Sequence, residues 1–130
     1  MADAMTKKKR PVYLDLVRIR LPLPGFVSIL HRVSGAGLFL FLFLLLSMLQ
    51  DSLTSPQSFA AIKQTLANPI AKLIGFGLLW AYLHHFCAGI RYLFLDVDIG
   101  VELHQARASS WAVLVISITL ALVIGGKLLW

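Results

Sequence analysis

Three long apolar segments dominate the chain, at about residues 28–50, 70–95 and 110–130, and shorter polar segments separate them. The first is almost wholly apolar and is centred on residues 38–46. As an α-helix its 23 residues would extend about 35 Å, which is enough to cross the hydrocarbon core of a bilayer. The pattern therefore predicts an all-α integral membrane protein with three transmembrane helices.

Proline and serine residues set the expected start of the first span. Pro22 and Pro24 argue against a regular helix at the end of residues 1–27, whereas Ser28 is a good residue to begin one. We therefore expect a basic, cytoplasmic N-terminal arm over residues 1–27 and a three-helix transmembrane anchor domain over residues 28–130.

The two connections between the spans are polar. Residues 51–69 are expected to form a loop that holds one surface helix turn between Ser58 and Ala67. A shorter connection with several charged residues follows the second span and extends to about Arg107.

Composition indicates that lipid, rather than water, is the natural solvent for most of the chain. Apolar residues make up 58% of it and charged residues only 14%, whereas soluble domains carry about a quarter charged residues. With this composition, a chain of 130 residues lacks the polar groups needed to cover the surface of a soluble domain.

The charge distribution favours a membrane topology signal over nucleic-acid binding. The formal net charge is +6, but the basic residues crowd the first quarter of the chain, beside the first apolar run. An inside N-terminus and an outside C-terminus would place nine basic residues on the inner face and three on the outer face, as the positive-inside rule requires. The inner residues would be Lys7, Lys8, Lys9, Arg10, Arg18, Arg20, Arg32, Arg91 and Arg107, and the outer ones Lys63, Lys72 and Lys127.

Cysteine usage limits the redox chemistry that the chain can hold by itself. Cys87 is the single cysteine, which excludes an intrachain disulfide, a self-contained iron–sulfur cluster and a C-x-x-C-H haem attachment. Any redox centre must be a non-covalent cofactor or belong to a partner.

Histidines in the second span are the first candidates for such a cofactor, because ionisable residues inside a membrane are costly and usually functional. His85 is expected about 16 Å from the inner end of its helix. It could pack against another helix, relay protons, or ligate a b-type haem as a neutral imidazole. Gly89, one turn later, would let a flat macrocycle approach. His84 points about 100° away, so one histidine of the pair would bind and the other would pack.

His31 is the only histidine on another span. With the helix beginning at Ser28, His31 falls in its first turn, so we expect His85 to lie about 10 Å deeper in the bilayer. Two axial ligands must meet iron at similar depth. The spacing therefore predicts that the second ligand comes from another chain.

Ser28 and Arg32 share a helix face at the inner end of the first span, because they are four residues apart. They could be a helix cap and a topology signal. Alternatively, the hydroxyl and the guanidinium could bind a quinone head group, one through a hydrogen bond to a carbonyl and the other by stabilising developing negative charge. His31 and Arg32 are also placed to pair with haem propionates.

Three sequence blocks carry a resemblance to a known family. They read RPVYLDL at residues 10–16, SILHRVSG at residues 28–35, and HFCAGIR at residues 85–91, followed by Asp96. In this order, and with three spans, they resemble the cytochrome b556 membrane-anchor subunits of succinate dehydrogenase, or respiratory complex II. The resemblance extends from about Arg10 to Trp130.

The resemblance implies a non-catalytic subunit of a succinate dehydrogenase (quinone) complex in the tricarboxylic acid cycle and electron transport. The partners would be a flavoprotein, an iron–sulfur protein and a second membrane anchor, with ubiquinone as substrate and haem b shared between the two anchors. By motif, His85 matches the axial ligand to the haem iron, which His84 does not. Ser28 and Arg32 match quinone-site residues, and His31 matches a residue near the haem propionates.

Tyr92 departs from the family, which often has histidine directly after the G-I-R triplet. Tyrosine brings no positive charge at neutral pH, so Tyr92 is left out of the haem contacts. Arg91 remains a weaker candidate for a propionate or an inner-surface contact.

Two other functions fit the same pattern. The chain could be the anchor of a fumarate reductase, or a cofactor-free structural or transport subunit. A bacterial inner membrane is favoured over a mitochondrial one.

Overall fold

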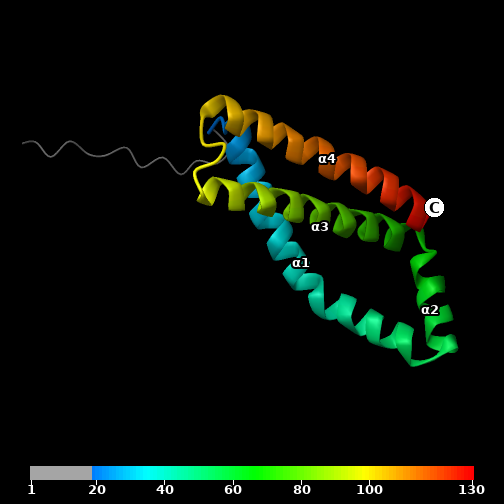
Figure 1. Cartoon of the computed structure of the whole chain (residues 1–130). Helices are drawn as coiled ribbons and strands as arrows, with labels where there is room; N and C mark the ends of the chain where they lie inside the picture. Colours follow the sequence, from blue (N-terminus) through cyan, green and yellow to red (C-terminus); the bar gives the residue numbers. More distant parts are fainter. Residues whose placement is uncertain (1–18) are drawn as a thin grey trace, which may run out of the picture.

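The computed structural model describes residues 19–130, which form four α-helices and no strand (Figure 1). The helices are α1 (Leu23–Thr54), α2 (Pro56–Leu66), α3 (Pro69–Asp96) and α4 (Leu103–Leu129). Helices α1, α3 and α4 are long and apolar enough to cross a membrane. Within the described residues, the expected all-α architecture with three candidate membrane spans is therefore confirmed.

Helix α1 begins at Leu23 rather than at Ser28, so the expectation that Pro22 and Pro24 prevent a helix here is wrong. Pro22 is the N-cap residue, in an extended conformation, and Pro24 lies in the first turn. The first N–H groups of a helix have no acceptor within it, so proline loses no hydrogen bond there. Most of the expected arm, residues 1–18, lies outside the described residues.

The connections are shorter than expected because helices extend into them. Residues 56–66 form the complete helix α2, which begins with a reciprocal capping box between Ser55 and Ser58. Helix α4 begins at Leu103, so its first turns are polar. The remaining connection turns at Asp98 and Gly100, which both have positive φ.

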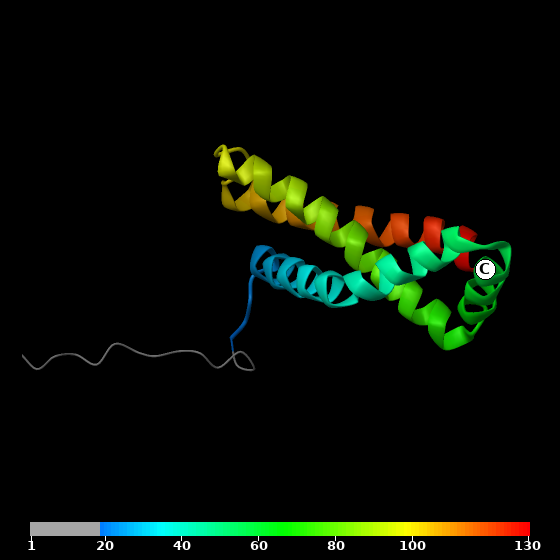
Figure 2. The ribbon, with the colours of Figure 1, turned by 90° about the horizontal axis from the view of Figure 1, so that it is seen from below.

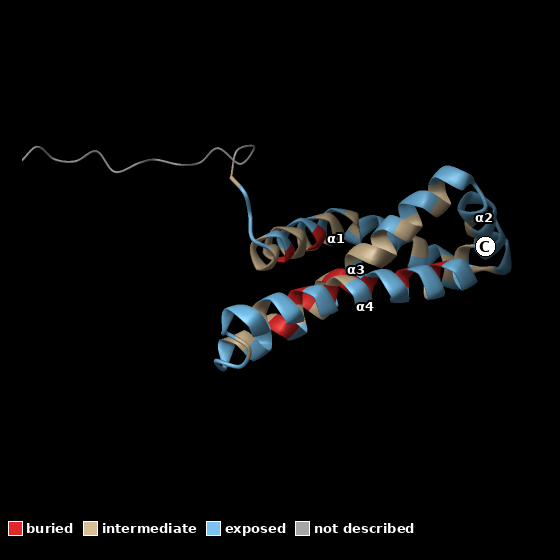
Figure 3. Ribbon diagram, turned by 90° about the horizontal axis from the view of Figure 1, so that it is seen from above, coloured by how far each residue is buried: buried red, intermediate tan, exposed pale blue. Residues whose placement is uncertain are grey.

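Helices α3 and α4 lie side by side along their length, whereas α1 lies against them only over its first half (Figures 1 and 2). The start of α1 lies at the same end of the molecule as the α3–α4 connection, and α2 joins the far end of α1 to the start of α3. Buried residues gather where the three long helices face one another (Figure 3). The second half of α1 exposes large apolar side chains such as Phe39, Leu40 and Phe43.

The face of α4 that is buried against its neighbours carries mostly small residues. They recur about once per turn, which lets helix backbones approach closely in a membrane. The buried positions of α4 are Ser110, Val113, Ser117, Ala121 and Gly125. The hydroxyls of Ser110 and Ser117 donate to carbonyl oxygens of the preceding turn, so they need no partner on another helix.

Candidate functional site

The imidazoles of His31 on α1 and His85 on α3 stack on each other, with ring centroids 4.1 Å apart and planes inclined by 10°. The two histidines therefore lie at the same depth, and the expected separation of about 10 Å is wrong. The cause is the earlier start of α1. His31 lies eight residues after Leu23 and His85 lies eleven residues before Asp96, which places them about 12 Å and 16 Å from neighbouring helix ends.

A hydrogen bond orients the half-buried ring of His85. Its Nδ1 lies 3.0 Å from the main-chain oxygen of His31 and 3.3 Å from Oγ of Ser34. A carbonyl oxygen can only accept, so the Nδ1–H tautomer satisfies this contact and leaves the lone pair on Nε2. No residue of the range 19–130 forms a hydrogen bond with Nε2. An imidazole held in this way is suited to bind a metal through Nε2.

The space for this ring exists because residue 35 is glycine. A Cβ atom at Gly35 would lie 2.7 Å from Cε1 of His85, closer than real Cβ contacts permit. Gly89, which the sequence associates with space beside His85, instead faces His31, with a Cβ position 3.8 Å from Nε2 of that residue. The roles of Ser34 and Gly35 were missed, although both lie in the SILHRVSG block.

His84 is enclosed in the bundle, with 0% of its surface exposed. Its ring packs 5.5 Å from that of Trp80, and neither ring nitrogen has a hydrogen-bond partner among the described residues. The adjacent histidines thus occupy different environments, one enclosed and one half-exposed, as expected from their 100° offset.

Ser28 and Arg32 lie one turn apart on α1, Ser28 half-buried and Arg32 exposed. Within residues 19–130, neither side chain takes part in a hydrogen bond or ion pair. Both polar groups are therefore available in the first part of α1, about 8 and 14 Å from its start at Leu23.

Arg91 turns towards α4. Its Nε donates to Oγ of Ser109 at 2.9 Å, and Nη2 donates to the main-chain oxygen of Ala106 at 3.4 Å. The neighbouring Tyr92 places its ring 5.1 Å from that of His31, and its hydroxyl is buried without a partner in the described part of the chain.

Comparison with known proteins matches residues 6–124 to the family model for the succinate dehydrogenase/fumarate reductase transmembrane subunit. The succinate dehydrogenase cytochrome b556 subunit of Coxiella burnetii is 37% identical over 94% of this chain and 98% of its own length. The subunit of the same name from Paracoccus denitrificans is 36% identical over 93% and 92%, and that from Rickettsia prowazekii is 31% identical over 89% and 90%. The chain therefore belongs to the succinate dehydrogenase/fumarate reductase transmembrane subunits, in the cytochrome b556 group of succinate dehydrogenase anchors.

Proposed function

We propose that the chain is the haem b-containing membrane anchor of a succinate:ubiquinone oxidoreductase. The main observation behind this proposal is the hydrogen bonding and the surroundings of the His85 ring. Its Nδ1 is committed to a main-chain carbonyl, its Nε2 has no partner within residues 19–130, and Gly35 clears the space beside the ring. When bound, haem would supply a one-electron redox centre within the bilayer.

The residues fit haem at His85 better than at His84. An imidazole ligates iron only where a macrocycle can reach it, and His84 is enclosed on all sides. His85 is half-exposed, and its ring orientation is set by the carbonyl of His31 and the hydroxyl of Ser34. Such outer contacts hold metal-binding histidines in place.

The second axial ligand is proposed to come from the second anchor. The rings of His31 and His85 stack face to face, with their centroids 4.1 Å apart. No macrocycle fits between rings so close. Although His31 lies at the same depth as His85, it is therefore not the proposed second ligand. That the haem is shared between two anchor subunits stays a proposal.

Ser28 and Arg32 are proposed to bind the ubiquinone head group. The serine hydroxyl would donate to a quinone carbonyl, and the exposed guanidinium would stabilise negative charge on the quinone oxygen as it is reduced. Both side chains lie on one face of α1, Ser28 three positions before His31 and Arg32 one position after it. For the haem propionates, His31 and Arg91 remain the predicted contacts.

The proposed assembly contains a flavoprotein, an iron–sulfur protein, a second anchor and this chain. Electrons from succinate would pass through the soluble subunits to ubiquinone at the membrane, so this chain alone would be no catalyst. The relatives named above are bacterial, and we place the chain in a bacterial inner membrane with its N-terminus inside.

The test is a reduced-minus-oxidised absorption spectrum of the purified complex. His85→Leu is expected to abolish or shift the b-type band, because iron loses its ligand from this chain. His84→Leu, the neighbouring control, is expected to retain the band, since that ring only packs. Loss of the band in His84→Leu alone would mean that His84, and not His85, is the ligand. A wild-type complex without the band would support a cofactor-free anchor instead.

A further inference from the structure

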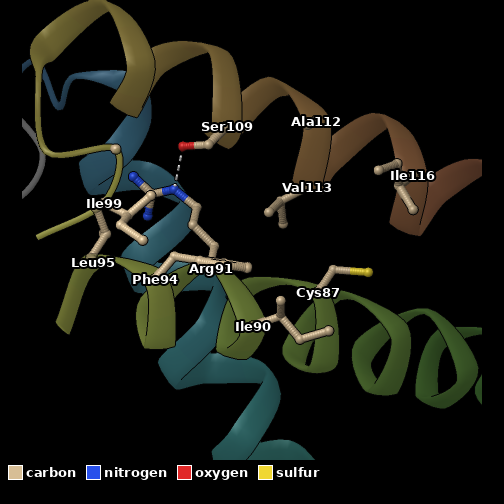
Figure 4. A pocket seen from close by; sticks show the side chains of 11 residues that line it. Cys87, Ile90, Arg91, Phe94, Leu95, Ile99, Ser109, Ala112, Val113 and Ile116 are labelled. Carbon is tan, nitrogen blue, oxygen red and sulfur yellow. Dashed lines mark hydrogen bonds between the residues drawn. The ribbon is translucent and has the colours of Figure 1, made fainter. Parts of the chain in front are cut away.

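A cavity of about 590 Å³ lies between α3 and α4, next to the connection that joins them (Figure 4). Apart from Arg91 and Ser109 its walls are almost wholly apolar, with Ile90, Phe94, Val113 and Ile116 among them. Its volume falls in the range of about 300–1,000 Å³ that is usual for small-molecule sites. Because Ile90, Phe94 and Ile116 are themselves exposed, the cavity opens at the surface of the α3–α4 pair.

Arg91, in the wall of this cavity, is a buried cation without a counter-ion among residues 19–130. Only 7% of its surface is exposed. Its two hydrogen-bond partners, a hydroxyl and a carbonyl, are neutral, and so is the ring of Tyr92, whose centroid lies 5.4 Å from the guanidinium carbon. A guanidinium has five N–H donors, of which two are used here. A buried charge is costly unless it is paired, so this position calls for an anion.

The cavity lies on the opposite side of α3 from His85. Ile90 and Phe94 are five and nine residues after His85, which turns them about 140° and 180° around the helix. An anion that enters through this cavity would therefore not be part of a haem bound at His85.

We propose that this cavity binds an anionic phospholipid, with its phosphate on Arg91 and part of an acyl chain between α3 and α4. A free inorganic anion would leave the apolar walls unfilled, and a neutral apolar molecule would leave the guanidinium unpaired. A phospholipid satisfies both requirements, and guanidinium groups pair with phosphate through charge-assisted, often bidentate, hydrogen bonds. This proposal assigns Arg91 to a lipid phosphate in place of the propionate contact proposed above, and it leaves His31, His85, Ser28 and Arg32 to the proposed haem and quinone sites.

The test uses the purified, assembled complex, titrated in mild detergent with dioleoyl phosphatidylglycerol or dioleoyl phosphatidylcholine and observed by native mass spectrometry. Arg91→Gln is expected to weaken retention of phosphatidylglycerol roughly tenfold or more, because a charge-assisted pair is lost. Arg107→Gln is the matched control, since Arg107 is exposed on α4 outside the cavity.

A second pair of variants tests the cavity without changing the charge. Ala112→Phe, which fills it, is expected to weaken phosphatidylglycerol retention while leaving the haem spectrum and quinone reduction intact. Val115→Phe adds the same bulk at an exposed position outside the cavity and should change neither. These two variants test the lipid site even if the Arg91→Gln complex fails to assemble.

Three results would overturn the proposal. The first is unchanged phosphatidylglycerol retention in Ala112→Phe. The second is equal retention of the two lipids by the wild type, which would leave only an apolar groove. The third is loss of the haem band in Arg91→Gln with lipid retention intact, which would assign the guanidinium to a propionate. Absence of haem from the wild type would contradict the proposed function but not this lipid site.

Discussion

At residue scale, the environment of one imidazole depends on three neighbours from another helix. The carbonyl of His31 and the hydroxyl of Ser34 fix the Nδ1 edge of His85, and the missing side chain of Gly35 makes room for the ring. Each is a residue of α1 acting on a residue of α3. The orientation of His85 is therefore sensitive to small changes on α1.

Gly35→Ala is expected to displace His85 and so to lower the haem content or shift the reduced absorption band. The new Cβ would overlap the ring at 2.7 Å, and overpacking of this kind typically costs about 1–3 kcal/mol. Gly37→Ala is the control, because a Cβ there meets nothing within 4 Å. An unchanged spectrum in Gly35→Ala would show that the ring position does not depend on this contact.

Arg32→Leu is expected to reduce ubiquinone reduction about tenfold or more, since charge-assisted hydrogen bonds are worth about 1.5–3 kcal/mol. Reduction of an artificial dye by the soluble subunits should persist. Steady-state assays with both acceptors make the comparison, and Arg107→Leu serves as the control, because Arg107 is an exposed arginine on α4 rather than on α1. Normal quinone kinetics would leave Arg32 a topology signal, whose loss should instead impair assembly.

At element scale, the contact between α3 and α4 depends on small side chains. The buried face of α4 carries a serine, alanine or glycine at nearly every turn, and Gly125 lies directly against the ring of Phe76. The helices approach closely because these positions lack bulk.

Gly125→Ala is expected to lower the thermal stability of the complex, because the added Cβ would lie 2.7 Å from Cδ2 of Phe76. The cost should be about 1–3 kcal/mol. Gly126→Ala, on the adjacent position, meets nothing within 4 Å, and alanine favours the helix over glycine by about 1 kcal/mol. Thermal denaturation of the two variants should separate them; equal melting temperatures would mean that Phe76 moves aside freely.

At the scale of the whole molecule, the three long helices do not form a closed bundle. Helix α1 diverges from α3 after its first half and exposes its apolar side chains (Figure 1). In a membrane these surfaces face lipid or a partner, which is consistent with an anchor that works only within a complex.

Topology is a property of the whole chain, and we expect the C-terminus outside. Alkaline phosphatase fused after Trp130 should be active and green fluorescent protein fused there should be dark, because nine of the twelve basic residues favour the inner side when the N-terminus is inside. Fusions after Gly100, in the α3–α4 connection, should behave in the opposite way. The reverse pattern would mean an inverted orientation.

The sequence by itself determined the class of the molecule and its three spans. An apolar segment of about 20 residues must satisfy its backbone hydrogen bonds internally in lipid, so local composition alone predicts a helix. The ends of the helices were less predictable. A proline in the first turn, such as Pro24 in α1, suggests a loop from sequence although it is compatible with a helix. The same holds for the polar first turns of α4, which begins at Leu103.

Only the tertiary structure decided what surrounds each polar side chain. The crossing of α1 over α3 brings His31 and His85 to one depth, sets Gly35 beside His85, and leaves His84 enclosed. The packing of α4 on α3 turns Arg91 towards Ser109. These contacts join residues far apart in the chain and depend on helix starts and crossing geometry, which no local pattern of apolar and polar positions specifies.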